Sequence, residues 1–202
     1  MDVLLIYPHS STSGIEEGIK VPPLGLAYLG AVLEKNGYKV HILDLNAEPE
    51  LSNDFKRILQ EGKPGIVGIT CLTPFYSAVL SLAKIAKEIT KARVVLGGAH
   101  ATALPEELLR SNIIDYIVLG EGEPTLLELS DSLLKGKSSP ESVKGIAYIK
   151  DGSFNKTASR EYIQNLDELP FPSRHLLPIG KYTSPQYDQS KVTSIITSRG
   201  CP

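Results

Sequence analysis

The chain has 202 residues, of which 42% are hydrophobic and 22% are charged, which is usual for a globular protein with one substantial domain and an extension. Its formal net charge of -2 and the lack of a basic run favour neither nucleic acid nor an anionic membrane as a partner. No apolar segment is long enough to cross a bilayer. Two cysteines, Cys71 and Cys201, cannot form a disulfide framework and indicate a reducing, cytoplasmic location.

Residues 1–138 alternate between predicted strands and predicted helices. The strands are short apolar runs rich in β-branched residues, and we expect them at 3–7, 39–45, 66–70, 93–96 and 115–119. The pattern predicts an α/β domain with a five-stranded parallel sheet and helices on both faces. Because crossovers are right-handed, the expected strand order is 2-1-3-4-5, a flavodoxin-like variant of the Rossmann arrangement.

The pattern changes after Ser138. Residues 139–164 are predicted to form a β-hairpin extension that turns at Asp151-Gly152. Residues 165–190 contain the Pro-rich stretch NLDELPFPSRHLLP and are predicted to be a linker. Residues 191–198 are again β-branched and apolar, so we expect a further strand that belongs to a following domain.

The carboxyl ends of the five parallel strands are rich in Gly, Ser, Thr and acidic residues. These ends share one edge of the sheet, where open α/β sheets bind their ligands. The stretch VVLGGAHAT is the most marked, because a Gly pair removes both side chains there. Ordinary turn chemistry explains any one loop, but the five together favour a ligand site. The candidate ligand contacts are Pro8, His9, Ser10, Asp44, Thr70, Leu72, Thr73, Gly97, Gly98, His100, Ala101, Thr102, Gly120, Glu121, Gly122 and Glu123.

Two of these loops resemble those of the cobalamin-binding domain, whose motifs include SxL and GG. Here the counterparts are Thr70-Cys71-Leu72 and Gly97-Gly98. Over the whole chain, PPLGLAYLGAVLEKNGY, LGGAHAT, DYIVLGEGE, LDELPFPSRHLLP and TSRGCP occur in the order found in cobalamin-dependent radical S-adenosylmethionine enzymes. That family includes methyltransferases and magnesium-protoporphyrin IX monomethyl ester oxidative cyclase.

The resemblance implies that the small-molecule partner is cobalamin, with its dimethylbenzimidazole tail between the Gly pair and the Thr70 hydroxyl. It also implies a [4Fe–4S] cluster and S-adenosylmethionine in a longer parent enzyme, where Cys201 would be the first of three cluster ligands. Residues 191–202 would then be the first strand of the catalytic barrel, and that barrel would be the partner of this domain. Without the barrel, we expect the chain to catalyse nothing.

The first loop departs from the family pattern because it lacks DxHxxG. His9 lies in the right loop, but Tyr7 stands where the orienting Asp belongs. We therefore expect cobalamin to bind base-off without a protein imidazole on cobalt, and His100 to be a contact rather than a ligand. Cys71 is expected to be a small buried side chain rather than a nucleophile.

Two alternatives remain open from the sequence. The hydroxyl-rich loop HSSTSG is similar to the phosphate loop of flavodoxins, although it is separated from the next helix. A flavin-binding module is therefore one alternative. The other is a degenerate domain that keeps the fold as an interaction module and binds no cofactor.

Overall fold

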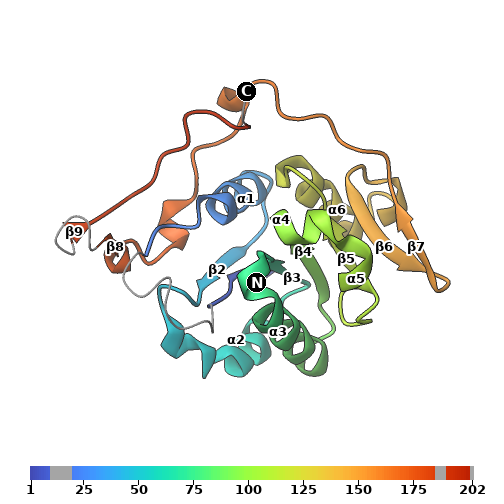
Figure 1. Ribbon diagram of the computed structural model, residues 1–202, viewed down its shortest axis with the longest axis horizontal. Coiled ribbons are helices and arrows are strands. Elements are labelled where there is room, and N and C mark those ends of the chain that lie inside the picture. Colours follow the sequence, from blue (N-terminus) through green and yellow to red (C-terminus); the bar gives the residue numbers. More distant parts are fainter. Residues whose placement is uncertain (10–19, 185–189, 201–202) are drawn as a thin grey trace.

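The computed structural model describes residues 1–9, 20–184 and 190–200 of the chain. Its main feature is a sheet of seven strands in the order β2-β1-β3-β4-β5-β6-β7 (Figure 1). The strands are β1 (Val3–Tyr7), β2 (Val40–Asp44), β3 (Ile66–Thr70), β4 (Arg93–Gly97), β5 (Tyr116–Val118), β6 (Ile146–Lys150) and β7 (Ser153–Lys156). The first five are parallel, which confirms the predicted order 2-1-3-4-5.

Strands β6 and β7 form the predicted hairpin. It turns at Asp151 and Gly152, whose φ angles of 50° and 75° are typical of a tight hairpin turn. β6 pairs antiparallel with β5, so the hairpin extends the main sheet instead of standing apart from it. The sheet is therefore larger than the five strands predicted, because the hairpin covers the edge of β5, whose backbone groups would otherwise be unpaired.

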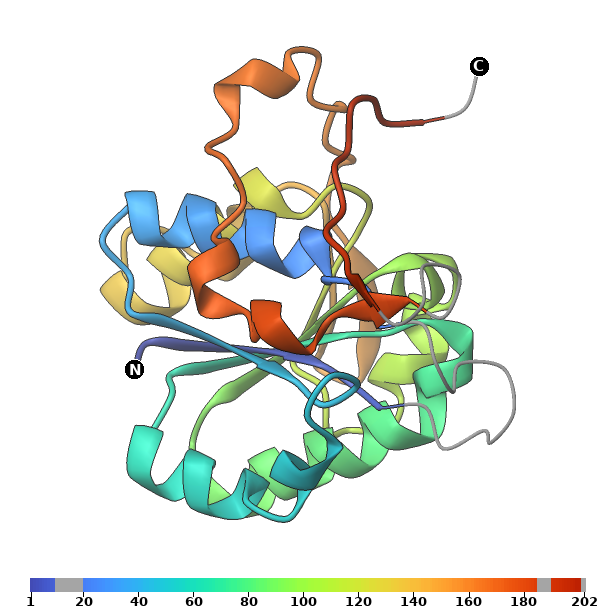
Figure 2. The ribbon, with the colours of Figure 1, turned by 90° about the vertical axis from the view of Figure 1, so that its left-hand side faces the viewer.

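Six α-helices are found among the described residues, and they cover both faces of the sheet (Figures 1 and 2). One face packs against α1 and α6, and the other packs against α2, α3, α4 and α5. Buried β-branched and Leu residues alternate between these two faces along each parallel strand. The bounds are α1 (Leu24–Lys35), α2 (Phe55–Gly62), α3 (Tyr76–Ile89), α4 (Ala99–Ala103), α5 (Pro105–Leu109) and α6 (Glu123–Lys135).

Two predicted loops at the strand ends are partly helical. Residues 99–103 form the single turn α4, so His100 is on a helix and not in an irregular loop. Helix α6 begins at Glu123, with Gly122 as its cap and Pro124 in its first turn. Pro is favoured there because the first N–H groups of a helix have no intrahelical partner.

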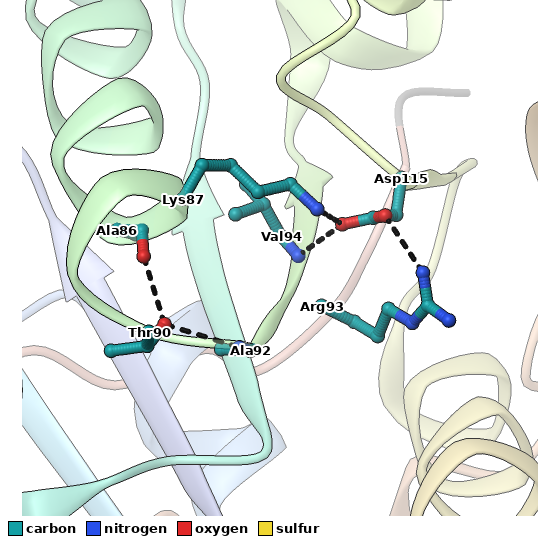
Figure 3. A network of polar contacts seen from close by, with 7 residues as sticks. All are labelled: Ala86, Lys87, Thr90, Ala92, Arg93, Val94 and Asp115. Carbon is teal, nitrogen blue, oxygen red and sulfur yellow. Dashed lines mark hydrogen bonds and ion pairs between the residues drawn. The ribbon is translucent and has the colours of Figure 1, made fainter.

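Asp115, which precedes β5, holds together the amino-terminal ends of the neighbouring strands, opposite to the carboxyl ends where the candidate ligand contacts lie (Figure 3). Its carboxylate accepts the backbone N–H of Val94 at 2.7 Å. It also pairs with Nζ of Lys87 on α3 at 2.5 Å and with Nη1 of Arg93 at 3.2 Å. One carboxylate therefore ties two strands and a helix together at the end of the sheet far from the candidate site.

The segment predicted to be a linker packs on the face of the sheet that α1 covers (Figure 2). It contains three short 3-10 turns, Leu166–Glu168, Arg174–Leu176 and Ile179–Lys181. A short strand, β8 (Thr183–Ser184), follows and pairs with β9 (Ser190–Lys191).

Tyr182 anchors this segment in the core. Its side chain is fully buried, and its hydroxyl donates a 2.8 Å hydrogen bond to Oδ2 of Asp44, at the end of β2. Oδ1 of Asp44 accepts the backbone N–H groups of Asn46 and Ala47. Both carboxylate oxygens of Asp44 therefore have hydrogen-bond partners within the protein, although only 1% of the residue's surface is exposed.

Strand pairing ends at Lys191, so residues 192–199 do not form the strand that their β-branched pattern predicts. A strand needs a neighbour to share its hydrogen bonds, and none of the described strands lies beside these residues. None of the helices in the described ranges is long and apolar enough to cross a membrane.

Replacing Tyr182 with Phe tests the anchor. Loss of the hydroxyl leaves a buried carboxylate oxygen of Asp44 without its donor, and we expect about 1–3 kcal/mol of destabilisation at neutral pH. Urea denaturation measures the change in the free energy of unfolding, with Tyr162→Phe as the control because Tyr162 is 73% exposed.

The loss of unfolding free energy caused by Tyr182→Phe should depend on pH. Burial raises the pKa of Asp44 above its unfolded value, so unfolding free energy falls as pH rises from the unfolded pKa through the folded one. The Tyr182 hydroxyl opposes that shift. The variant should therefore lose more stability at neutral pH than at a pH where Asp44 is protonated, and a uniform loss would contradict this account.

Candidate functional site

A pocket of about 310 Å³ lies between the sheet and the helices α1 and α6, at the carboxyl ends of the parallel strands. Its lining is mostly apolar, and glycines and a few polar residues complete it. The apolar residues in the lining are Leu5, Leu26, Leu29, Ile69, Val95, Leu96, Val118, Leu126 and Ile196. The candidates from the sequence that line it are Thr70, Gly97, Gly98, Gly120, Glu121, Gly122 and Glu123.

Two glycines with different surroundings line this pocket. Gly68 lies in the middle of β3 on the face toward α1, and a Cβ there would lie 2.8 Å from Cδ2 of Leu5. At Gly97 a Cβ would have only the carbonyl oxygen of Val118 nearby, at 3.9 Å, so a side chain would project into free space. Sequence reasoning found Gly97 but missed Gly68, although a glycine inside the strand IVGIT is itself a signal of close approach.

Gly98 has a different function from Gly97. Its φ is +99°, and a Cβ would lie 2.8 Å from the carbonyl oxygen of Cys71. That carbonyl accepts the backbone N–H of His100, while the N–H of Cys71 donates to the carbonyl of Gly97 at 2.7 Å. Gly98 therefore allows the loops after β3 and β4 to meet backbone to backbone.

Cys71 is fully buried, and burial raises the pKa of its thiol to about 11. The thiol is therefore neutral at physiological pH and is not a nucleophile. This agrees with its predicted function as a small packing residue.

His100 lies beside the pocket rather than in its lining. Its Nδ1 lies 3.1 Å from Oγ1 of Thr73, and its ring meets that of Tyr76 edge to face. Its Nε2 is shielded from solvent and has no hydrogen-bond partner among the described residues. A buried nitrogen of this kind is suited to a polar group that a ligand would bring.

Several other predicted contacts also lie outside the pocket lining. Ala101 is in the core, and the hydroxyl of Thr102 accepts the backbone N–H of Gly120 at 3.2 Å, which joins α4 to the loop after β5. Pro8 is buried and His9 is exposed at the end of β1. The remaining predicted contacts outside the lining are Asp44, Leu72 and Thr73, while Ser10 and Cys201 lie outside the described residues.

The two acidic residues of the loop after β5 face a partner that sequence reasoning missed. Oε1 of Glu121 lies 3.3 Å from Nη1 of Arg199, and Oε1 of Glu123 lies 2.5 Å from Nη2. The second carboxylate oxygen of Glu121 accepts the backbone N–H of Ile163 at 2.7 Å. Both acids therefore hold later parts of the chain, and Arg199 also lines the pocket.

A comparison with protein families matches residues 14–130 to the B12 binding domain. An uncharacterized methyltransferase of Pyrococcus horikoshii, PH0819, is 40% identical over 100% of this chain and 44% of its own length. The cytidylyl-2-hydroxyethylphosphonate methyltransferase of Streptomyces wedmorensis is 32% identical over 98% of this chain and 46% of its length. The anaerobic magnesium-protoporphyrin IX monomethyl ester cyclase of Rubrivivax gelatinosus is 35% identical over 100% of this chain and 37% of its length. The chain spans less than half the length of these relatives.

Solved structures agree with this grouping. The radical S-adenosylmethionine methyltransferase TsrM of Kitasatospora setae, with cobalamin and a [4Fe-4S] cluster bound, has a TM-score of 0.65 and 25% identity over 78% of this chain and 31% of its own. The cobalamin-dependent S-adenosylmethionine radical enzyme OxsB, with aqua-cobalamin bound, shares the fold, with a TM-score of 0.72 and 22% identity over 85% of this chain and 24% of its own. The resemblance drawn from the sequence motifs is confirmed, and the chain belongs to the B12 binding domain family.

Proposed function

We propose that this chain holds cobalamin at the carboxyl edge of its parallel sheet, as the cofactor domain of a longer radical S-adenosylmethionine enzyme. The observation that carries the proposal is the apolar pocket at the ends of β3 and β4, where Gly97 leaves open space. Its volume of about 310 Å³ is at the low end of ligand pockets and suits a tail rather than a whole corrin. The corrin itself would lie outside the pocket, across the strand ends.

The residues present fit the dimethylbenzimidazole tail. Leu5, Leu26, Leu29 and Val95 offer an apolar wall, and Thr70 is a polar residue of the same lining. Burying an aromatic group of on the order of 200 Å² at ~25 cal/mol per Å² contributes roughly 5 kcal/mol before entropy costs. When bound, cobalamin supplies the redox chemistry of cobalt, while the chain's own residues bind the tail and exclude water from it.

The same proposal divides the chain into four parts. Residues 1–138 are the cofactor domain, 139–164 its hairpin extension, 165–190 the connection, and 191–202 the start of the catalytic barrel. The greater length of the relatives supports a barrel in the parent protein. There Cys201 would be the first ligand of a [4Fe–4S] cluster, and the barrel would be the partner of this domain.

Titration of the chain with aquacobalamin, followed by its visible spectrum, tests the proposal. Base-off binding shifts the spectrum because the benzimidazole leaves cobalt. Flavin mononucleotide is the comparison ligand: tight flavin binding without cobalamin binding would favour the flavodoxin-like alternative. A folded chain that binds neither would favour an interaction domain.

Gly97→Leu should block the pocket without disturbing the fold. The new side chain meets free space rather than backbone, so it fills the position of the tail. Losing about half of the tail's contribution weakens cobalamin binding roughly a hundredfold, since each 1.4 kcal/mol is tenfold. Gly180→Leu is the matched control, because Gly180 is not among the lining residues and a Cβ built on it has no atom within 4 Å.

Gly98 is not a suitable position for this test, because its positive φ and the nearby Cys71 carbonyl make any side chain strain the backbone. If Gly97→Leu bound cobalamin with unchanged affinity and kept its circular dichroism spectrum, the proposal that the dimethylbenzimidazole tail lies in this pocket would be contradicted.

Cobalt should have no protein imidazole on its lower face, because the first loop lacks the carboxylate that would orient His9. We expect His9→Ala and His100→Ala each to leave the electron paramagnetic resonance spectrum of bound cob(II)alamin unchanged. Nitrogen hyperfine splitting in the wild type that disappears in either variant would identify that histidine as the ligand and overturn the prediction.

This 202-residue chain should take up no stoichiometric iron–sulfur cluster. A [4Fe–4S] cluster needs three or four protein ligands, and Cys201 together with the buried Cys71 cannot supply them. Iron analysis after anaerobic reconstitution measures the cluster content of the chain, and four iron atoms per chain would show the prediction to be wrong.

A further inference from the structure

The apolar side chains of the pocket lining come from the strands and from both helices that cover them. β1 supplies Leu5, β4 supplies Val95, α1 supplies Leu26 and Leu29, and α6 supplies Leu126. None of these side chains can donate or accept a hydrogen bond. A polar ligand group that enters between them therefore leaves water without gaining a partner from them.

The polar side chains of the same lining are few, and most are already engaged. Oε1 of Glu121 and Oε1 of Glu123 lie 3.3 Å and 2.5 Å from the guanidinium of Arg199. The second carboxylate oxygen of Glu121 accepts the N–H of Ile163. The hydroxyl of Thr70 has no hydrogen-bond partner in the part of the chain that the structure describes. Among the described residues, one short hydroxyl is therefore the polar side chain of this lining that remains unpaired.

Leu29 differs from the other apolar side chains that the helices and the sheet give to the pocket. Leu5 is 1% exposed, Leu26 5% and Val95 2%, whereas Leu29 is only half-buried. A side chain can touch an incoming group only with surface that it has not already buried. Leu29 also faces the start of α6, because a Cβ on Gly122 would lie 3.2 Å from its Cδ2. Leu29 therefore presents free apolar surface in the pocket.

Cobamides share the corrin and the nucleotide loop, and they differ in the base at the end of the tail. In cobalamin this base is dimethylbenzimidazole, which carries methyl groups and, once it has left cobalt, a single free ring nitrogen. Adenine has no methyl group, and its exocyclic amine and additional ring nitrogens are hydrogen-bonded in water. One hydroxyl beside an apolar wall can pair with the benzimidazole nitrogen, but it leaves most polar atoms of adenine without a partner.

We propose that this pocket selects the lower base of the cofactor by its polarity, that it favours a methylated benzimidazole over a purine such as adenine, and that Leu29 sets this preference. The inference rests on the proposed binding of the tail in the pocket. Leu29 is then a specificity-determining residue that contacts the base and takes no part in the chemistry at cobalt.

Affinities of the wild-type chain for three cobamides test the selection. The probes are cobalamin, benzimidazolylcobamide, which lacks the methyl groups, and adeninylcobamide. Because each base must first leave cobalt, the base-on equilibrium of each free cobamide is measured by acid titration and its contribution to the affinity is removed. We expect the corrected affinity to fall roughly tenfold when the methyl groups are lost, and a further tenfold or more with adenine. Equal corrected affinities would overturn the selection.

Leu29→Gln should narrow the preference for cobalamin over adeninylcobamide by roughly tenfold. Its carboxamide gives the purine a donor and an acceptor and removes apolar contact from the benzimidazole. Leu127→Gln is the matched control, because Leu127 is also half-buried, packs on the same face of the sheet and is not among the lining residues. A preference that narrows in both variants, or in neither, would contradict the assignment of Leu29.

The preference is compared as a ratio of affinities, so the base-on equilibrium of each free cobamide cancels between the wild type and a variant. Leu29→Met keeps an apolar side chain of similar volume and should keep the wild-type ratio. If Leu29→Met narrowed the ratio as much as Leu29→Gln, packing rather than polarity would set the preference and the inference would be wrong. The comparison of cobamides in the wild type needs no variant, so it decides the question even if Leu29→Gln does not fold.

Cobinamide, which lacks the nucleotide tail, separates this inference from the proposed function. The expected result is that all three cobamides bind more tightly than cobinamide, with cobalamin first and adeninylcobamide last. Tighter binding of all three with equal corrected affinities would leave the tail in the pocket and overturn only the selection of the base. A folded chain that binds neither cobinamide nor any cobamide would overturn the proposed function and the selection together.

Discussion

The pocket depends on the absence of side chains on one face of the sheet. Protein interiors are packed about as densely as organic crystals, so helices laid on a sheet normally leave no space of ligand size. Here Gly97 in β4 leaves open space under α1 and α6, while Gly68 in β3 lets the side chain of Leu5 lie close against the sheet, and about 310 Å³ remains. The same helices stay in contact in the pocket lining itself, where a Cβ on Gly122 would lie 3.2 Å from Cδ2 of Leu29. The cavity is therefore a local gap in a core that is otherwise well packed.

Much of this arrangement could be predicted from local sequence patterns. The five parallel strands and their order follow from alternating apolar runs, and the turn at Asp151-Gly152 gives the hairpin. The Gly pair after β4 indicated the edge where the pocket opens. Each of these signals lies within a few residues, so periodicity and turn chemistry are enough to read it.

The parts that could not be predicted depend on contacts between distant residues. Tyr182 and Asp44 are 138 positions apart, and the stretch around Tyr182 is Pro-rich and polar enough to suggest a free linker. Arg199 and Glu123 are 76 positions apart, and no spacing rule joins them. The stretch after β4 was predicted as a loop of small residues, yet backbone contacts with Cys71 and Gly98 accompany a helical turn at residues 99–103.

The carboxylates at the strand ends are paired with groups from later segments of the chain. Asp44, Glu121 and Glu123 were all expected to face a ligand, but each is engaged by a later segment through Tyr182, Arg199 or the N–H of Ile163. The nucleotide tail of cobalamin carries a phosphodiester, and bare carboxylates beside it would repel that charge. Arg199 offsets one of the two carboxylate charges of Glu121 and Glu123 and places a cation in the pocket wall. The chain that returns over the domain therefore attaches itself through these acids and brings positive charge to the edge where the proposed ligand would lie.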